Sequence, residues 1–304
     1  MSALSHRPTG APGPDPGHAL TPSGNLRRRQ LTSRLVLSGM LAAAGLAVGV
    51  LLTLLYYTAK QGIGQISLSF LTSDLPPYNG VGGGIGPALQ GTVEMVMIST
   101  LIALPVGLLT AIYLSEFAGP VAAGLMRTAL DLMAGLPTIV IGVVVYGLIA
   151  NRFGYSGFAG GVALSIVQVP LIARASLESI RRVPNNLREA SDALGVAHWR
   201  SVVGVILPTA SNGIVTATLL AIARAAGETA PVLFTSSVFP LNYQLDPRHG
   251  MASIPMAILN MMNSGYPAAI DKAWGAAFFL IILILAINIA ARVWLRRSER
   301  RRGL

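Results

Sequence analysis

Six stretches of mainly apolar residues constrain the fold of this chain more than any other feature. A helix that crosses a lipid bilayer needs about 20 such residues. The stretches occupy, to within about four residues at each end, residues 35–59, 88–115, 128–150, 156–177, 210–237 and 273–295. Because 53% of the 304 residues are hydrophobic and only 11% are charged, one soluble core could not bury them. The sequence therefore predicts an all-α fold, a polytopic membrane helix bundle with six transmembrane helices.

Positive charge predicts the orientation of these helices. Most Lys and Arg residues flank alternate ends of the spans, and such clusters mark the cytoplasmic side. They include Arg27, Arg28, Arg29, Arg34, Arg127, Arg181, Arg182, Arg188, Arg200, Arg296 and Arg297. Both termini and the loop 178–208 are thus expected in the cytoplasm, with loops 60–87 and 238–272 outside. The net charge of +10 follows from this topology, so no nucleic-acid partner is expected.

The ends of the chain have a different composition from the spans. Residues 1–25 are rich in Pro, Gly, Ser and Thr and are predicted to be a disordered cytoplasmic tail. Residues 26–60 are predicted to be a first transmembrane helix that stays uncleaved, because its apolar run is too long for a signal peptide. Residues 298–304 form a basic cytoplasmic tail. With no Cys and only four scattered His, no metal site is expected.

The cytoplasmic loop 178–208 has the pattern of a helix, a turn and a second helix. Pro184 suits the start of a helix, and Gly195 suits its end. Leu187, Ala190 and Leu194 lie at spacings of three and four, and so share one face. A short amphipathic helix that protrudes from a membrane protein is shaped to bind in a groove on a cytoplasmic partner.

This loop resembles the coupling segment of ABC importer permeases. The family pattern is Glu-Ala-Ala, three residues, Gly, nine residues, Ile, one residue and Leu-Pro. Glu189, Ala190, Gly195, Leu207 and Pro208 fit this spacing, whereas Ser191 and Val205 replace an Ala and the Ile; the alternative is an ordinary helix-turn-helix. The resemblance implies the MetI-like fold of type I importers and docking on an ATPase. The contacts would come from Leu187, Glu189, Ala190, Ser191, Leu194 and Gly195.

The same resemblance bears on catalysis. The sequence contains no Walker pattern, so ATP must be bound elsewhere. We therefore expect the chain to be a transport subunit and not an enzyme. No cofactor is expected on this chain, with ATP and Mg²⁺ on the partner ATPase. The Gly-rich run at 82–86 lacks a Lys and is expected to be a loop and not a phosphate cradle.

Further stretches resemble the phosphate branch of these permeases, the PstA type. They are residues 84–92, 111–116, 135–139 and, most specifically, 223–231, which read Ala-Arg-Ala-Ala-Gly-Glu-Thr-Ala-Pro. The resemblance implies a permease core at 84–297 and inorganic phosphate as the substrate. It also implies a bacterial plasma (inner) membrane, a second permease (PstC-type), two ATPase subunits (PstB-type) and an extracytoplasmic phosphate-binding protein (PstS-type).

Charged residues inside the apolar spans are the candidates for a substrate path. A charge at mid-membrane costs about 2.5 to 3.5 kcal/mol, so it should face protein or a water-filled path. Arg224 and Glu228 are four residues apart and can reach each other. The planar guanidinium of Arg224 would donate hydrogen bonds to an oxyanion. Glu228 would weaken the affinity of Arg224 for that anion so that the anion can leave. Glu94 could pair with Arg224 or meet water. The alternative is that Arg224 and Glu228 form a structural ion pair.

Three expectations complete the interpretation. Pro105, Pro137, Pro170 and Pro231 predict kinks or breaks in their spans. The apolar positions Met251, Ile254, Ile258 and Met261 predict a helix at the membrane interface, in preference to a docking ridge for an external protein. The rival functions are a permease for molybdate or sulfate and, from another class, an ion-coupled secondary transporter, which would have no use for the loop at 189–195.

Overall fold

The computed structural model describes residues 26–77, 81–236 and 240–302, and within them all regular structure is helical. The predicted disordered tail at 1–25 lies outside the described residues. By its internal contacts the chain divides into two units, Met1–Tyr56 and Tyr57–Leu304. Five described helices are long and apolar enough to cross a membrane, or six if one bent pair counts as a span. The predicted all-α membrane bundle is thereby confirmed.

The first unit consists of most of α1 (Leu26–Gly62). This helix has 37 residues, which gives it a length of about 55 Å, more than a bilayer core requires. Its described side chains from Arg28 to Tyr56 are all exposed, and most of them are apolar. A helix that is apolar on every side is suited to lipid.

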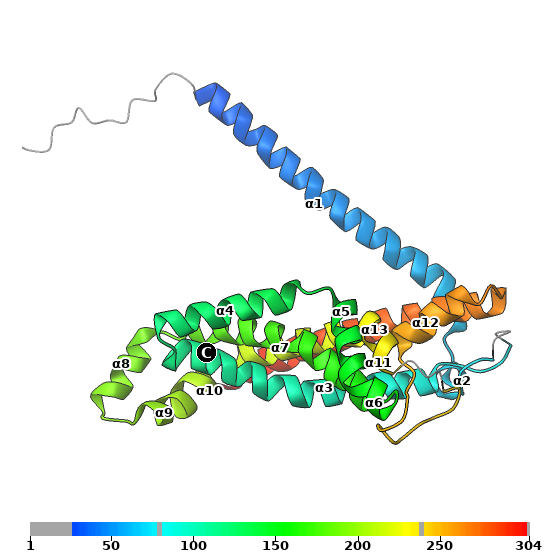
Figure 1. The fold of residues 1–304 in the computed structure, drawn as a ribbon. Coiled ribbons are helices and arrows are strands. Elements are labelled where there is room, and N and C mark those ends of the chain that lie inside the picture. The colour runs from blue at the N-terminus through cyan, green and yellow to red at the C-terminus, as the bar shows by residue number, and fades with distance from the viewer. Residues whose placement is uncertain (1–25, 78–80, 237–239, 303–304) are drawn as a thin grey trace, which may run out of the picture. The chain divides into compact units, whose positions relative to one another are not determined.

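The core of the second unit is a pair of closely packed helices, α3 (Gly86–Ile112) and α7 (Gly157–Arg181) (Figure 1). Small residues let the two backbones approach. A Cβ at Gly161 of α7 would lie 2.5 Å from Cγ2 of Ile98 of α3. The fully buried Gln168 donates a hydrogen bond of 2.9 Å to the Ser99 hydroxyl. The pair is therefore held by close packing and by a buried polar contact.

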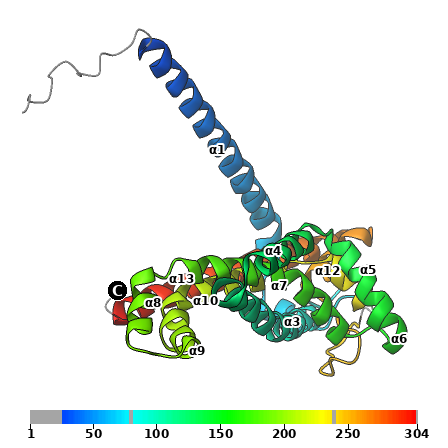
Figure 2. The same cartoon turned by 60° about the vertical axis from the view of Figure 1, so that its left-hand side comes forward.

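Helix α10 (Leu207–Ala226) packs beside this pair, and another long helix, α13 (Pro267–Arg302), packs against α10 (Figures 1 and 2). The fifth apolar stretch is not one helix, because α10 ends at Ala226 and a separate short helix, α11 (Ala230–Thr235), follows. Pro231 lies in the first turn of α11, whereas Pro105 and Pro170 lie inside continuous helices. The predicted break near Pro231 is confirmed.

The third apolar stretch differs from a straight span over 128–150. It is divided between α4 (Pro120–Gly135) and α5 (Thr138–Val145), and α5 continues through a π-helical turn (Tyr146–Ala150) into α6 (Asn151–Phe153). The two halves meet at an angle of 95°. The cause is Pro137, which forces the preceding Leu136 into an extended conformation with a ψ of 134°. The predicted interruption at Pro137 is confirmed, but the sequence did not indicate its angle.

The segment after the fifth stretch also differs from expectation. Helix α12 (Ile254–Asn263) packs against α13, and Met251, Ile254 and Met261 are buried. Its apolar side joins a core cluster with Ile85 and the short helix α2 (Leu68–Thr72). The predicted helix is confirmed, but its apolar side is covered by the bundle itself.

Candidate functional site: a protruding helix and a broken helix

The first candidate site is the helix-turn-helix at one end of the second unit (Figures 1 and 2). Helix α8 (Asn185–Ala193) follows Pro184, and Gly195 after it has a φ of +68°. The amide of Val196 donates to the carbonyl of Ser191, and that of Gly195 to Asp192, which is the Schellman pattern of a helix end. Helix α9 (His198–Ser201) and a π-helical turn (Val202–Ile206) then lead into α10. The predicted start at Pro184 and end at Gly195 are confirmed.

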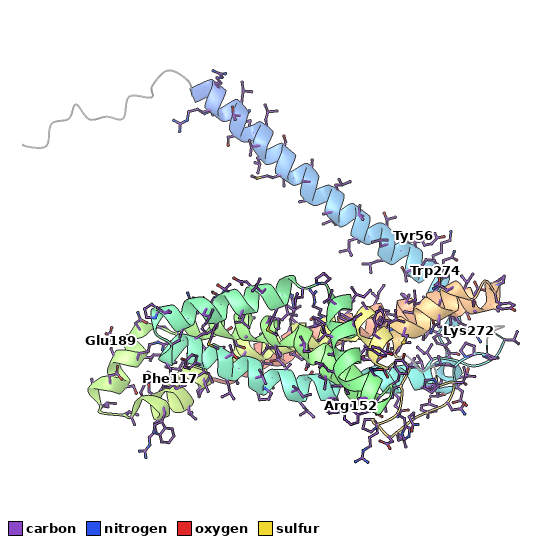
Figure 3. All side chains as sticks on the ribbon, viewed as in Figure 1. Tyr56, Phe117, Arg152, Glu189, Lys272 and Trp274 are labelled. Carbon is purple, nitrogen blue, oxygen red and sulfur yellow. The ribbon has the colours of Figure 1, made fainter. Side chains whose placement is uncertain are left out.

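The apolar face of α8 is directed away from its own bundle. Leu187, Ala190 and Leu194 are exposed, Leu194 to 82%. Glu189 is exposed as well, and Figure 3 shows it at this end of the unit. Ser191 differs from the rest of the predicted set, since it is buried against the bundle. The exposed set has the shape and chemistry of a helix that binds in a groove of another protein.

A buried carboxylate beneath α8 was missed in the sequence. Glu116 lies in the π-helical turn that ends α3 (Tyr113–Phe117), and its side chain is only 2% exposed. It accepts a hydrogen bond from Nη1 of Arg188 on α8. Its other oxygen accepts the hydroxyl of Ser115 at 2.8 Å. The signal that could have found it is an acidic residue at the end of an apolar run, next to a loop rich in Arg.

The second candidate site lies where the fifth stretch is broken. Arg224 is in the last turn of α10, and Glu228 lies in the break before α11. Nε of Arg224 is 3.4 Å from Oε1 of Glu228. The two side chains thus do reach each other. Irregular backbone at membrane depth is tolerated where it faces protein or a water-filled cavity, and broken helices often build the substrate site of transporters.

Arg224 opens onto a groove between α7, α10 and α13. The groove has a volume of about 690 Å³, and its polar lining residues are Arg174, Glu178, Arg224 and Asn288. The Arg224 side chain is 55% exposed, whereas that of Glu228 is 15% exposed. Arg174 also forms an ion pair with Asp131 of α4. The guanidinium of Arg224 is therefore accessible from the groove although it is paired.

The remaining predicted site residue, Glu94, lies elsewhere. Its carboxylate accepts a hydrogen bond of 2.7 Å from Gln90 Nε2, which also donates to the carbonyl of Gln244. Among the ion pairs of the described residues, none joins Glu94 to Arg224. The structure therefore brings Arg224 and Glu228 together without Glu94.

Neither an anion cradle nor a metal cluster is visible in the described part of the chain. In the Gly-rich run, the amides of Gly84, Ile85 and Gly86 donate to the carbonyls of Asp74, Phe70 and Ser73. These amides are thus not available to a phosphate. The described residues also contain no group of three His, Asp or Glu side chains that could hold a metal ion.

Comparison with known sequences gives consistent matches. The model of the family "Binding-protein-dependent transport system inner membrane component" matches residues 103–303. The phosphate transport system permease protein PstA of Yersinia pestis is 36% identical over 245 residues, which cover 80% of this chain and 83% of that protein. PstA 1 of Mycobacterium tuberculosis (strain ATCC 25618 / H37Rv) is 40% identical over 225 residues, 73% of each chain.

Solved structures agree on the fold. An inward-facing MetNI methionine ABC transporter matches with a TM-score of 0.57 at 20% identity, covering 68% of this chain and 93% of the other. A bacterial alginate ABC transporter matches with a TM-score of 0.61 at 14% identity, covering 90% of this chain and 96% of the other. At such identities these matches establish the architecture alone.

Proposed function

The chain belongs to the family of binding-protein-dependent transport system inner membrane components, in its PstA-type branch, and we infer that it is the membrane-spanning subunit of an ATP-driven phosphate importer. The observation that carries this inference is α8, whose exposed apolar face fits a groove on another protein. The chain has no Walker pattern, so ATP hydrolysis belongs to a separate subunit.

The family membership also supports an assembly. The chain works with a further permease subunit and with ATPase subunits. We propose that the further permease is of the PstC type and that the ATPases are two PstB-type subunits. A PstS-type protein would deliver phosphate from outside. The end that carries α8 would face the cytoplasm of a bacterium together with both termini, in agreement with the clustering of Arg at that end.

We propose that Arg224 and Glu228 lie on the phosphate path. Arg224 is accessible from the groove, and its planar fork of donors matches two oxygens of a phosphate. Glu228 competes for the same guanidinium, so that the anion is held weakly enough to leave. The helix break between α10 and α11 gives this segment the irregular backbone that is common at transport sites.

The rival functions have less support. The relatives from Yersinia pestis and Mycobacterium tuberculosis are named as phosphate permeases, and neither name specifies molybdate or sulfate. An ion-coupled secondary transporter would need no α8. The alternative that Arg224 and Glu228 only lock the fold is disfavoured by the exposure of Arg224.

The function is tested by reconstitution. The full complex, purified through a tag on this chain and placed in liposomes with ATP inside and the binding protein outside, should accumulate phosphate. Uptake should stop when a non-hydrolysable ATP analogue replaces ATP, and excess molybdate or sulfate should not compete. Uptake of phosphate driven by an ion gradient without ATP, or preferential uptake of another oxyanion, would overturn the proposal.

A further inference from the structure

We propose that Glu116 is a positioning residue, which ties α8 to the packed pair α3 and α7 so that a movement of α8 is transmitted to the membrane helices. We call Ser115, Glu116, Arg188 and His198 the Glu116 clamp. This inference rests on the proposed function, because it assigns a role in coupling between the ATPase and the transport path. It concerns side chains on the inner side of α8, not the face that meets the partner.

The burial of Glu116 makes the clamp an obligatory contact. Its side chain is 2% exposed, and both carboxylate oxygens are engaged, one by Ser115 and one by Arg188. A buried carboxylate without a partner is strongly disfavoured. Arg188 therefore cannot leave Glu116 at little cost, and α8 is held to the end of α3 throughout any movement that keeps the fold.

Arg188 joins α8 to α7 as well. While Nη1 binds Glu116, Nη2 donates a hydrogen bond of 3.1 Å to the carbonyl of Ile180, in the last turn of α7. The same carbonyl accepts the amide of Val183 at 3.2 Å, so the guanidinium uses its second acceptor position. One guanidinium thus connects α8 to the ends of both α3 and α7.

The two helices that receive this connection are packed as one body. Gln168 binds Ser99, and Gly161 of α7 lies directly against Ile98 of α3. A displacement at their α8 end is therefore transmitted along both helices. Without the clamp, α8 would keep the backbone link around Pro184 and its contacts with α9 and the following π-helical turn, but no charged contact with the ends of α3 and α7.

The clamp also contacts the segment that leads to Arg224. Nε2 of His198, the first residue of α9, is 3.9 Å from the same Glu116 oxygen that binds Arg188. The His198 ring meets the Phe117 ring edge to face, with 5.2 Å between centroids. Helix α9, the π-helical turn and α10 form one continuous helical run, His198–Ala226. The run that carries Arg224 therefore starts at the clamp.

Helix α8 needs such a support. It has nine residues, and a helix of that length is not stable in water on its own. Leu187 is 37% exposed and Leu194 82%, so the apolar side chains contribute little packing within the chain. Ser191 is buried, and Arg188 supplies a charged contact with the bundle through Glu116.

The test uses Glu116→Gln and Arg188→Gln in the reconstituted complex, with Arg181→Gln as the matched control. Arg181 is an exposed arginine at the same end of α7 and lies outside the clamp. We expect both clamp variants to hydrolyse ATP while phosphate taken up per ATP falls by about tenfold or more, a scale typical of coupling between distant sites. The control should keep the parental ratio. Clamp variants that assemble and keep the parental ratio would overturn the proposal.

A second measurement covers the case in which the clamp variants fail to assemble. The chain has no Cys, so spin labels can be placed at Arg181→Cys on α7 and Asp192→Cys on α8, both exposed, with the clamp intact. We expect the same narrow distance distribution between the labels before and after ATP binding. A shift or broadening with ATP in a transport-competent complex would show that α8 pivots on α7 and would overturn the proposal.

The two measurements separate this inference from the proposed function. The label distance is read without phosphate, so it tests the clamp even if the complex carries another substrate. A parental complex that hydrolyses ATP but takes up no phosphate would contradict the proposed substrate. The label distance would still test the clamp in that complex.

Discussion

Nε of Arg224 lies 3.4 Å from Oε1 of Glu228, and α10 ends between the two residues. The pair thus lies at a break in a membrane helix and beside a groove that leaves Arg224 accessible. A structural ion pair would be expected to enclose both charges. Here the arginine is 55% exposed and the glutamate 15%, which supports the proposal that Arg224 can exchange its carboxylate partner for an anion.

The first prediction concerns that arginine. Arg224→Gln should abolish phosphate uptake in a complex that still assembles, because the path loses its fixed charge. Arg224→Lys should retain part of the activity, since a point charge lacks the fork that matches two oxygens. Uptake is measured in proteoliposomes, and assembly by copurification of the other subunits.

The double variant separates the path from a structural pair. Arg224→Gln with Glu228→Leu removes both charges, so assembly should be normal under either interpretation. Transport should stay absent if Arg224 meets the anion. Parental uptake by the assembled double variant would remove Arg224 from the path.

The second prediction concerns Gly195, which has a φ of +68° after α8. Gly195→Val should impair transport and the binding of the ATPase, because a residue with a Cβ disfavours this conformation by roughly 1 kcal/mol or more. Apart from the adjoining residues, the described part of the chain places no atom within 4 Å of the added Cβ, so the effect comes from the backbone and not from a clash. The measurements are ATPase copurification and uptake.

Gly204→Val provides the matched control, since the space beside Gly204 is equally open and its φ is not positive. That variant should insert, assemble and transport normally. Normal uptake by Gly195→Val would contradict the role assigned to the end of α8.

The third prediction concerns orientation, and it uses the absence of native Cys. Asn242→Cys should react with an impermeant thiol reagent added outside intact cells, whereas Asn186→Cys on α8 should react only after the membrane is permeabilised. Both positions are exposed on this chain, so the membrane decides from which side the reagent reaches them. Labelling of Asn186→Cys in intact cells would invert the proposed topology.

Features of this fold were predictable from the sequence where the interacting residues lie close together along the chain. The bounds of α8, the break at Pro137 and the reach of Arg224 to Glu228 depend on residues within one or two turns, and local pattern predicts them. The contact of Glu116 with Arg188 joins residues 72 positions apart. No local pattern specifies such a contact, which depends on how α3 and α7 pack.

The difference between local and distant contacts also explains why the expectations for α12 and for the angle at Pro137 were wrong or incomplete. The apolar residues of α12 were expected to face lipid, because periodicity shows that a face is apolar but not what covers it. Pro137 predicted an interruption but not an angle of 95°, since the packing of α5 against α11 directs the second half. A Cβ at Gly142 of α5 would lie 2.9 Å from Cα of Pro231, which shows how close that packing is.

The last prediction separates the stability of the Glu116 clamp from its role in coupling. Glu116→Gln or Arg188→Met alone removes one partner of a buried pair, a change that typically costs about 3 to 5 kcal/mol. Glu116→Gln leaves Arg188, which is 22% exposed, so we expect the lower end of this range or less; Arg188→Met leaves the 2% exposed Glu116 and should cost more. The melting temperature of the purified complex should therefore fall in each single variant.

The apolar double variant Glu116→Leu, Arg188→Met should recover much of that loss. Replacing a buried ion pair by apolar residues of similar volume is often neutral or stabilising. The double variant nevertheless lacks the donors that bind the Ile180 carbonyl and the end of α3 at the same time. Phosphate taken up per ATP should thus stay low although the melting temperature recovers. Recovery of both together would mean that the pair serves stability alone, and that α8 transmits its movement through the backbone.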